Sequence, residues 1–160
     1  MSSDDPDVGR HPELPADPDV RPLYLRGRVL LWVFAGGLIG TGMRYWAEET
    51  FPAGEGHWPW ATFGVNVIGA LVLGALLELL TRLGRDEGWR RRVRLFGGTG
   101  LCGALTTYSA FALEISELTR VSAVATAATY AVASVLLGLV AAGCGIALAS
   151  RVPSRVENAA

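Results

Sequence analysis

Residues 97–111 read Gly-Gly-Thr-Gly-Leu-Cys-Gly-Ala-Leu-Thr-Thr-Tyr-Ser-Ala-Phe and lie within an uncharged run from Leu95 to Leu113. At about 1.5 Å per residue, this run is long enough to cross the hydrocarbon core of a bilayer. Its middle is a poor helix former, because glycine weakens helices and unpaired backbone groups are costly in lipid. Irregular backbone is tolerated at that depth where it lines a polar cavity, and freed carbonyl groups are good ion ligands. The stretch therefore predicts a broken helix in an ion pathway.

The rest of the composition is that of a membrane protein. Hydrophobic residues make up 51% of the chain, and the charged residues concentrate at the ends and in short connectors. We predict one four-span channel domain over residues 28–150. The N-terminal segment 1–27 holds most of the prolines and few aliphatic residues, so we expect a disordered tail there. Residues 151–160 form a short polar C-terminal tail.

Four membrane-spanning helices are predicted, with approximate ranges 28–46, 60–80, 95–113 and 121–150. The first contains Gly36 and Gly40, four residues apart, which would let another helix approach closely. Simple helix packing is the favoured interpretation of this pair. Glu114, Glu117 and Arg120 follow the third span and mark its exit from the membrane.

The connector between the second and third spans is rich in arginine. It contains Arg82, Arg85, Arg90, Arg91, Arg92 and Arg94. Basic residues next to spans favour the cytoplasmic side, and with four spans both tails share the side of this connector. The tails add Arg21, Arg26, Arg28, Arg151 and Arg155. We therefore expect an inner or plasma membrane protein with both termini in the cytoplasm.

Polar side chains inside the spans are the candidate lining of a pathway. Asn66 lies about two turns into the second span, where an amide needs a partner and usually faces the bundle interior or a water path. A structural interhelical hydrogen bond is the alternative. In the fourth span, Tyr130 and Ser134 share a face with Thr126, and Thr129 lies beside them. Hydroxyl groups can also bond to their own helix backbone, so pore lining and structural use both remain open.

Several other functions are disfavoured. The pattern Gly98-x-Gly100-x-x-Gly103 resembles a dinucleotide-binding turn, but arginines precede it where a hydrophobic strand is required. The spans contain no cluster with the spacing of a transition-metal site and no nucleophile with a histidine base. We therefore predict that the chain is not an enzyme.

The aromatic residues after the glycines suit an anion path. Aromatic rings present a positive edge, so Tyr108 and Phe111, three residues apart, could line such a path with their rims. Two aromatic residues at this spacing are more often part of a packed core.

Three segments together resemble the CrcB/Fluc family of fluoride channels. They are Gly100–Phe111, Gly64-Val-Asn66-Val-Ile-Gly69 and Gly40-Thr-Gly-Met-Arg44-Tyr, and the similarity covers about residues 29–149. The resemblance implies an all-α protein of four transmembrane helices, with the third helix broken at its centre. It also implies an antiparallel dimer with two pores that exports fluoride passively and lowers cytoplasmic fluoride.

The resemblance also implies roles for individual residues. Asn66 corresponds to the pore asparagine, Tyr108 and Phe111 to the aromatic box, and Thr107 and Ser109 to their neighbours on the broken helix. Arg44 corresponds to a structural arginine at the end of the first span. The backbone carbonyls of Gly103 and Thr106 correspond to ligands of a structural sodium ion at the dimer centre, which is not transported. Two positions depart from the family pattern, with Tyr108 in place of phenylalanine and Ala110 in place of a common threonine.

The alternative function is a small dual-topology exporter that couples cation export to protons. Such a transporter needs a carboxylate inside the membrane. The first span has none between Arg28 and Arg44, and Glu114 lies on a different element. The dimer partner is either a second copy of the chain or an oppositely oriented homologue.

Overall fold

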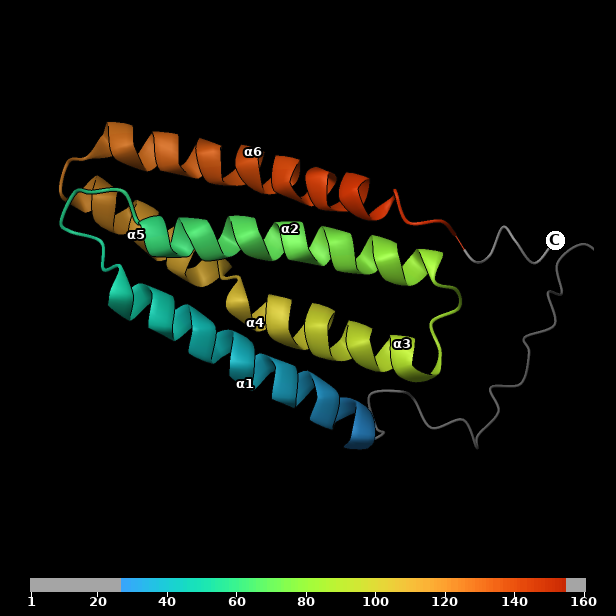
Figure 1. Ribbon diagram of the computed structural model, residues 1–160. Helices are drawn as coiled ribbons and strands as arrows, with labels where there is room; N and C mark the ends of the chain where they lie inside the picture. The colour runs from blue at the N-terminus through green and yellow to red at the C-terminus, as the bar shows by residue number, and fades with distance from the viewer. Residues whose placement is uncertain (1–26, 155–160) are drawn as a thin grey trace, which may run out of the picture.

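The structure is a computed structural model that describes residues 27–154, and every regular element in that range is a helix (Figure 1). The elements are α1 (Gly27–Thr50), α2 (Trp60–Arg82), α3 (Gly88–Val93), the π-helix η2 (Arg94–Cys102), α4 (Gly103–Leu105), α5 (Tyr108–Arg120) and α6 (Val124–Ala149). The chain passes back and forth four times, and α3, η2, α4 and α5 together make the third pass. The all-α prediction is confirmed. The predicted tails, apart from Gly27 and residues 151–154, lie outside the described residues.

Two helices, α2 and α6, are long and apolar enough to cross a membrane by length and composition. Among the described residues, neither α1 nor any of the shorter helices that make up the third pass meets the same criterion. The large apolar side chains of α6 stay exposed, with Leu139 at 67% and Val132 at 59%. A soluble protein buries a helix this apolar, so the outward face of α6 fits contact with lipid or a second chain.

Glycines bring the helices together in two close pairs. α1 packs on η2, where a Cβ atom at Gly36 would lie 2.9 Å from the Leu101 nitrogen and one at Gly40 would lie 3.0 Å from the Leu105 nitrogen. From the other side, a Cβ at Gly100 would lie 2.5 Å from the Val33 carbonyl oxygen. The backbones therefore touch directly, which is the packing role expected for Gly36 and Gly40.

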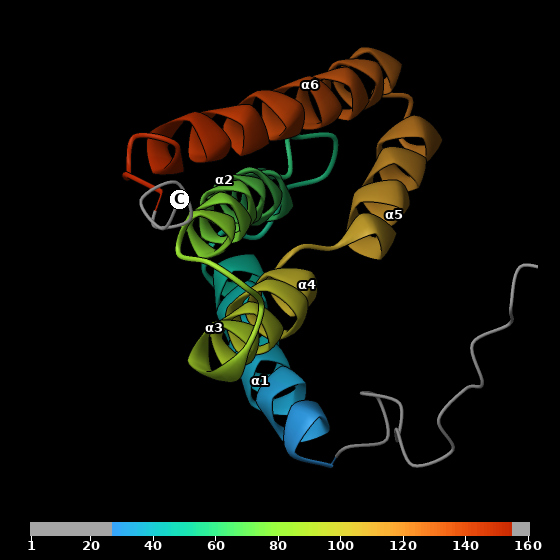
Figure 2. The same ribbon diagram turned by 90° about the vertical axis from the view of Figure 1, so that its right-hand side faces the viewer.

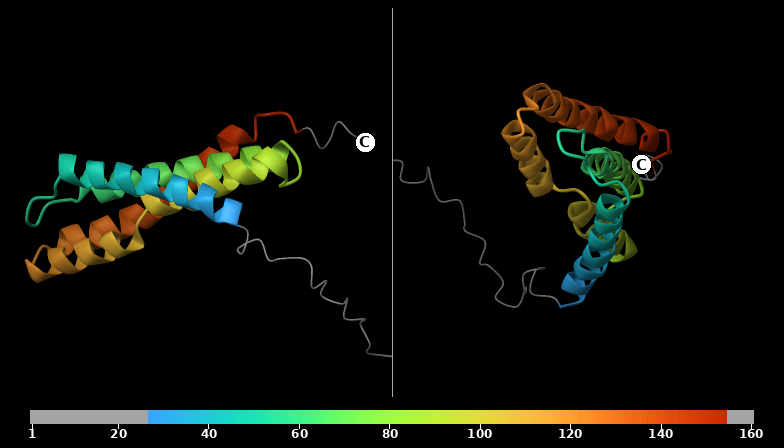
Figure 3. Two further views of the ribbon diagram at one scale, coloured as in Figure 1. Left: turned by 90° about the horizontal axis from the view of Figure 1, so that it is seen from below. Right: turned by 90° about the vertical axis from the view of Figure 1, so that its left-hand side faces the viewer.

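The second close pair is α2 with α6. A Cβ atom at Gly74 would collide with the Ala142 carbonyl, and one at Gly145 would collide with the Leu71 carbonyl. Viewed along the helices, these two pairs form adjacent parts of the molecule, and α5 lies beside the start of α6, away from α1 (Figures 2 and 3).

The helical path of the third pass is interrupted at two threonines. Thr106 has φ −80° and ψ 148°, and Thr107 has φ −146° and ψ 122°, so both are extended. Thr107 then caps α5, because its side-chain oxygen accepts a hydrogen bond from the Ala110 N–H at 3.1 Å. The glycine-rich residues before them stay helical, in the wide turns of η2 that pack on α1. The weakest helix formers of the segment are thus not the site of the interruption.

The connector at residues 83–87 and both ends of the described chain lie at the same end of the molecule (Figure 1). A hydrogen bond of 3.4 Å from Arg82 Nη1 to the Val152 carbonyl joins this connector region to the end of α6. The loop at residues 51–59 and the turn from α5 to α6 lie at the opposite end. This arrangement agrees with the expected common side of the connector and the two tails.

Candidate functional site

The interruption is held in place by Asn66 from α2. Its side-chain oxygen accepts a hydrogen bond from the Thr107 N–H at 2.8 Å, and its amide nitrogen donates to the Thr107 carbonyl at 3.1 Å. The amide thus pairs with both backbone groups of one residue that has left the helix. Asn66 therefore makes the structural hydrogen bonds between helices that were one of its two interpretations. One amide hydrogen and one oxygen lone pair of its side chain stay available for a further partner.

Backbone carbonyls are freed at the end of α4. In a continued helix the Thr107 N–H would bond to the Gly103 carbonyl, but it is donated to Asn66 instead. The Ala104 carbonyl accepts a hydrogen bond of 3.2 Å from Arg44 Nε, whose guanidinium also lies 3.5 Å from Glu48 Oε1. Arg44 therefore stabilises the end of α4 as a cation at a helix C-terminus.

A cavity of about 400 Å³ adjoins the interruption. Its polar and aromatic lining comes from three of the four passes of the chain, and consists of Asn66, Thr106, Thr107, Tyr108, Phe111 and Ser134. Tyr108 and Phe111 lie side by side with ring centroids 5.9 Å apart. Tyr108 is 81% exposed in the single chain, so its ring forms the rim of the cavity.

A series of rings leads from this cavity toward the 51–59 loop. The centroid of Phe111 lies 5.4 Å from that of Tyr130, which in turn lies 5.4 Å from Trp58 in an edge arrangement. Tyr130 is fully buried, and its hydroxyl donates to Glu114 Oε2 at 2.5 Å. The other oxygen of Glu114 accepts a hydrogen bond from the Thr62 hydroxyl, also at 2.5 Å.

Glu114 and Thr62 are functional candidates that the sequence reasoning missed. The sequence predicts only that Glu114 marks the exit of the third span, and Thr62 is a polar residue in the apolar run of the second span. The structure joins them through hydroxyl groups from α2 and α6, at sequence separations of 52 and 16 residues. A threonine near the start of an apolar span was the available signal, but its partner lies on another helix.

A second hollow, of about 520 Å³, opens at the end of the molecule that carries the 51–59 loop. Its charged and titratable lining residues are Glu55, His57, Glu114, Glu117 and Arg120. His57 is exposed, and its Nδ1 lies 2.9 Å from the Glu55 carbonyl oxygen. Glu114, which lines this hollow, bonds to Tyr130, and Tyr130 contacts Phe111, which lines the first cavity.

The structure does not bring all predicted pathway residues together. Ser109 is exposed, and its hydroxyl lies 3.1 Å from that of Thr107. Thr129 is exposed on the outer face of α6, where its hydroxyl donates to the Ala125 carbonyl at 2.7 Å. The hydroxyl stripe of α6, made of Thr126, Thr129, Tyr130 and Ser134, is therefore divided. Tyr130 and Ser134 face inward, whereas the Thr129 hydroxyl bonds to the backbone of its own helix. The role of Thr129 in the pathway stays a prediction.

Comparison with known proteins gives the family. The model of the family described as "CrcB-like protein, Camphor Resistance (CrcB)" matches residues 31–146, which include all of α2, the third pass and most of α1 and α6. The chain belongs to the CrcB family. The glycine pattern at residues 98–103 resembles a dinucleotide-binding turn, but in this CrcB protein it lies in a helix: Gly98 and Gly100 are buried in η2.

Curated relatives carry a functional name. This CrcB chain is 46% identical to "Fluoride-specific ion channel FluC 2" of Leifsonia xyli subsp. xyli, over 84% of this chain and 92% of the relative. It is 43% identical to "Fluoride-specific ion channel FluC 1" of Streptomyces avermitilis, over 72% of this chain and 91% of the relative. It is 41% identical to "Fluoride-specific ion channel FluC 2" of Nocardia farcinica, over 69% of this chain and 77% of the relative.

Proposed function

We propose that this chain forms a fluoride-selective channel that passes fluoride down its gradient across the cell membrane and lowers its cytoplasmic concentration. The observation that carries the proposal is family membership with long matches to proteins named fluoride-specific ion channels. The cavity lined by Asn66, Tyr108 and Phe111 supports it, because these are the residues expected to line the pathway. Fluoride efflux from liposomes, with chloride as the control anion, is the test.

The lining of the cavity is chemically suited to a small anion. Fluoride must exchange part of its hydration for other partners, and amide and hydroxyl groups donate hydrogen bonds. The free amide hydrogen of Asn66 and the hydroxyl of Ser134 lie at the cavity, while the edges of Tyr108 and Phe111 carry partial positive charge. No covalent step is involved in such passive movement.

The alternative, a proton-coupled cation exporter, depends on a carboxylate within the bundle. Glu114 is a half-buried carboxylate with hydrogen bonds from Thr62 and Tyr130, so it is the candidate for that role. An exporter would lose proton-coupled cation transport in Glu114→Gln and would show no fluoride efflux in the unchanged protein. The channel proposal requires the reverse for the unchanged protein, with fluoride efflux and no proton-coupled cation transport.

We also propose an antiparallel dimer with a structural sodium ion at its centre. The Gly103 and Thr106 carbonyls fit such an ion: the N–H groups that would pair with them in a helix bond instead to Asn66 and to the Thr107 side chain. Sodium is a hard cation and takes several oxygen ligands, so two carbonyls from one chain are too few. The same carbonyls of a second chain would complete the site, and the ion would hold the two interrupted helices together.

Substitution of Gly103 tests the sodium proposal. A Cβ atom there would meet the Gly98 carbonyl oxygen at an ordinary 3.8 Å, so Gly103→Val is expected to fold as a single chain with near-normal thermal stability. Added bulk beside the carbonyl should nevertheless abolish sodium binding and dimer assembly. The measurements are sodium-dependent stabilisation and the oligomeric state in detergent.

The matched control is Thr106→Ser, which keeps the main-chain carbonyl and the hydroxyl that donates to the Cys102 carbonyl at 2.9 Å. It should bind sodium normally. A Gly103→Val protein that binds sodium and dimerises as the unchanged protein does would place the ion elsewhere.

The arginine distribution leads to a prediction about orientation. Arginines at the connector end are Arg28, Arg82, Arg85, Arg90, Arg91, Arg92, Arg94 and Arg151, whereas Arg44 and Arg120 lie on the half of the molecule nearer the 51–59 loop. This asymmetry should fix the connector and both tails in the cytoplasm. An antiparallel dimer then needs an oppositely oriented homologue as partner at native expression levels.

A tag on the C-terminus, probed from each side of the membrane at native expression, decides this prediction. Labelling from the cytoplasmic side alone is expected and makes a second subunit necessary for an antiparallel dimer. Equal labelling from both sides would show that one gene product inserts in both orientations and pairs with itself.

A further inference from the structure

The connector end of the molecule carries more positive charge than its own carboxylates neutralise. Between residues 78 and 94 there are six arginines and three carboxylates, which leaves three positive charges in excess. Each carboxylate is already paired: Glu78 with Arg82 at 2.6 Å, Glu87 with Arg85 at 3.3 Å, and Asp86 with Arg94 at 2.7 Å and Arg91 at 3.9 Å. The hydrogen bond from Arg94 lowers the pKa of the Asp86 carboxyl, so that pair stays ionised at neutral pH.

Three exposed arginines at this end have no carboxylate partner among residues 27–154. They are Arg28, in the first turn of α1, Arg92, in α3, and Arg151, just after α6. Arg90 differs from them, because its Nε donates to the Arg85 carbonyl at 2.8 Å and its guanidinium lies 5.9 Å from the Trp89 ring centre. Arg28 and Arg92 therefore have free capacity to bind an anion, and they lie on paired elements, since α1 packs on η2 and α3 continues into η2, whereas Arg151 follows α6.

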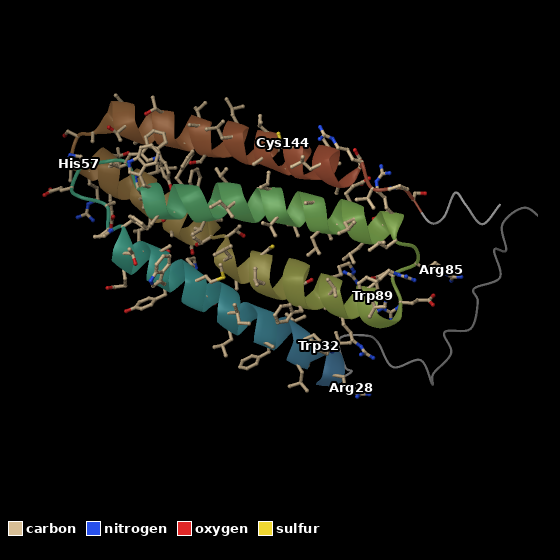
Figure 4. All side chains as sticks on the ribbon, in the orientation of Figure 1. Arg28, Trp32, His57, Arg85, Trp89 and Cys144 are labelled. Carbon is tan, nitrogen blue, oxygen red and sulfur yellow. The ribbon has the colours of Figure 1, made fainter. Side chains whose placement is uncertain are left out.

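Both arginines lie one helical turn outside an aromatic pair. Trp32 of α1 and Phe96 of η2 contact each other edge to face, with centroids 6.5 Å apart and planes at 84°. Arg28 precedes Trp32 by four residues and Arg92 precedes Phe96 by four, so each arginine shares a helix face with its aromatic residue. Figure 4 shows Arg28 and Trp32 at the start of α1 and Trp89 on α3, all at the connector end of the molecule.

We infer that this face, formed by Arg28, Arg92, Trp32 and Phe96, binds an anionic phospholipid, with its headgroup phosphate at the two arginines and its upper acyl region against the aromatic pair. Guanidinium groups bind phosphate through paired hydrogen bonds. Aromatic rings gather at the boundary between headgroups and hydrocarbon, and Trp89, 54% exposed, adds another ring at this level. The inference depends on the membrane location of the chain and not on what it conducts.

The excess charge is the reason to choose an anionic lipid. All phospholipids offer a phosphate, but a zwitterionic headgroup also brings a cation that the surplus arginines repel. Basic side chains near the surface attract anionic lipids by about 1 kcal/mol each, which corresponds to about fivefold in affinity for each arginine. The two arginines together should therefore give a preference of about 30-fold.

The experiment measures lipids retained by the full-length purified protein. The protein is equilibrated with equimolar phosphatidylglycerol and phosphatidylcholine in detergent, and the bound lipids are counted by native mass spectrometry. The unchanged protein should retain phosphatidylglycerol preferentially, and Arg28→Gln with Arg92→Gln should reduce that preference by about 30-fold. Each single variant should reduce it by about fivefold, which also covers the case in which the double variant does not fold.

The matched control is Arg85→Gln with Arg120→Gln, which removes the same charge from positions outside this face. Arg85 has a side chain that is 89% exposed and points away from α1 (Figure 4). Arg120 is the last residue of α5, which ends at the opposite end of the molecule (Figure 1). The control should retain the lipid preference. An equal loss in the control would show a general charge effect and overturn the proposed site.

A second arm separates a lipid from other anions. Inorganic phosphate or an acidic peptide is added to the protein carrying phosphatidylglycerol, and neither should displace it, because they lack the acyl region that contacts Trp32 and Phe96. Displacement by inorganic phosphate would make this a free-phosphate site, and displacement by the peptide would make it a protein-docking surface. Either result would contradict the lipid assignment.

Discussion

Replacing Phe111 with isoleucine is expected to lower fluoride efflux by up to about tenfold, because the variant loses the ring but keeps much of the bulk. Phe111 contacts Tyr108 on one side and Tyr130 on the other, and it lines the cavity at the helix interruption. An aromatic edge contributes about 0.5–1.5 kcal/mol beyond its buried area, and the loss of such an interaction at a barrier reduces a rate by up to about tenfold. The measurement is the initial rate of fluoride efflux from liposomes.

Two matched variants separate the ring from simple packing. Phe111→Tyr keeps the aromatic edge and should conduct within about threefold of the unchanged protein. Tyr108→Phe removes only a hydroxyl from an exposed ring and should also conduct well. If Phe111→Ile conducts as well as Phe111→Tyr, with equal thermal stability, the rings act only as packing.

Replacing Asn66 with alanine is expected to reduce both stability and flux. The amide makes two hydrogen bonds to Thr107, and its removal leaves a backbone N–H and carbonyl without partners at the interruption. Such a loss costs about 1–3 kcal/mol. The Thr107 N–H can then bond to the Gly103 carbonyl, as in a continuous helix, and extend α4. This extension would close the cavity beside the interruption, so we expect at least about tenfold less fluoride efflux.

The control for Asn66 is Asn66→Asp, which keeps the acceptor for the Thr107 N–H and loses the donor to the Thr107 carbonyl. It should retain the interruption and part of the stability but place a repelling charge or a lone hydroxyl at the cavity, so fluoride efflux should still fall. Normal efflux in both folded variants would remove Asn66 from the pathway. Normal stability in Asn66→Ala would show that the hydrogen bonds to Thr107 do not hold the interruption.

The helices themselves follow from local sequence, and their bounds differ from expectation by a few residues. α1 continues to Thr50 beyond the expected end near residue 46, and α6 begins at Val124 and not at residue 121. The hydropathy pattern cannot fix such ends, because the flanking residues Glu48 and Glu49 are good helix formers in any environment.

The exact place of the interruption could not be predicted from local preference. The glycines are the weakest helix formers in residues 97–111, yet they stay helical because Gly36 and Gly40 allow η2 to pack directly on α1. The chain leaves the helix at Thr107 because Asn66, 41 residues earlier, takes the hydrogen bonds of its backbone. Contacts between distant parts of the sequence therefore decide at which of several poor helix formers the helix is interrupted.

In the candidate site, too, the sequence predicts some of the neighbouring side chains and not others. Spacing correctly put Tyr108 beside Phe111, since residues three apart on one helix are neighbours. It could not choose between the two sides of the hydroxyl stripe, where Tyr130 is fully buried and the adjacent Thr129 is exposed. The pairing of Glu114 with Thr62 and Tyr130 requires three different helices to meet, and no local pattern contains that information.

The most direct test of the proposed function is fluoride efflux from liposomes that contain the purified, unmodified chain. Vesicles are loaded with potassium fluoride or potassium chloride, potassium exit is permitted by an ionophore, and the released anion is followed with an ion-selective electrode. Rapid release of fluoride, with chloride release no faster than in protein-free vesicles, is the predicted result. Protein that is folded and inserted but releases neither anion, or releases both at equal rates, would contradict the account of a fluoride-selective channel.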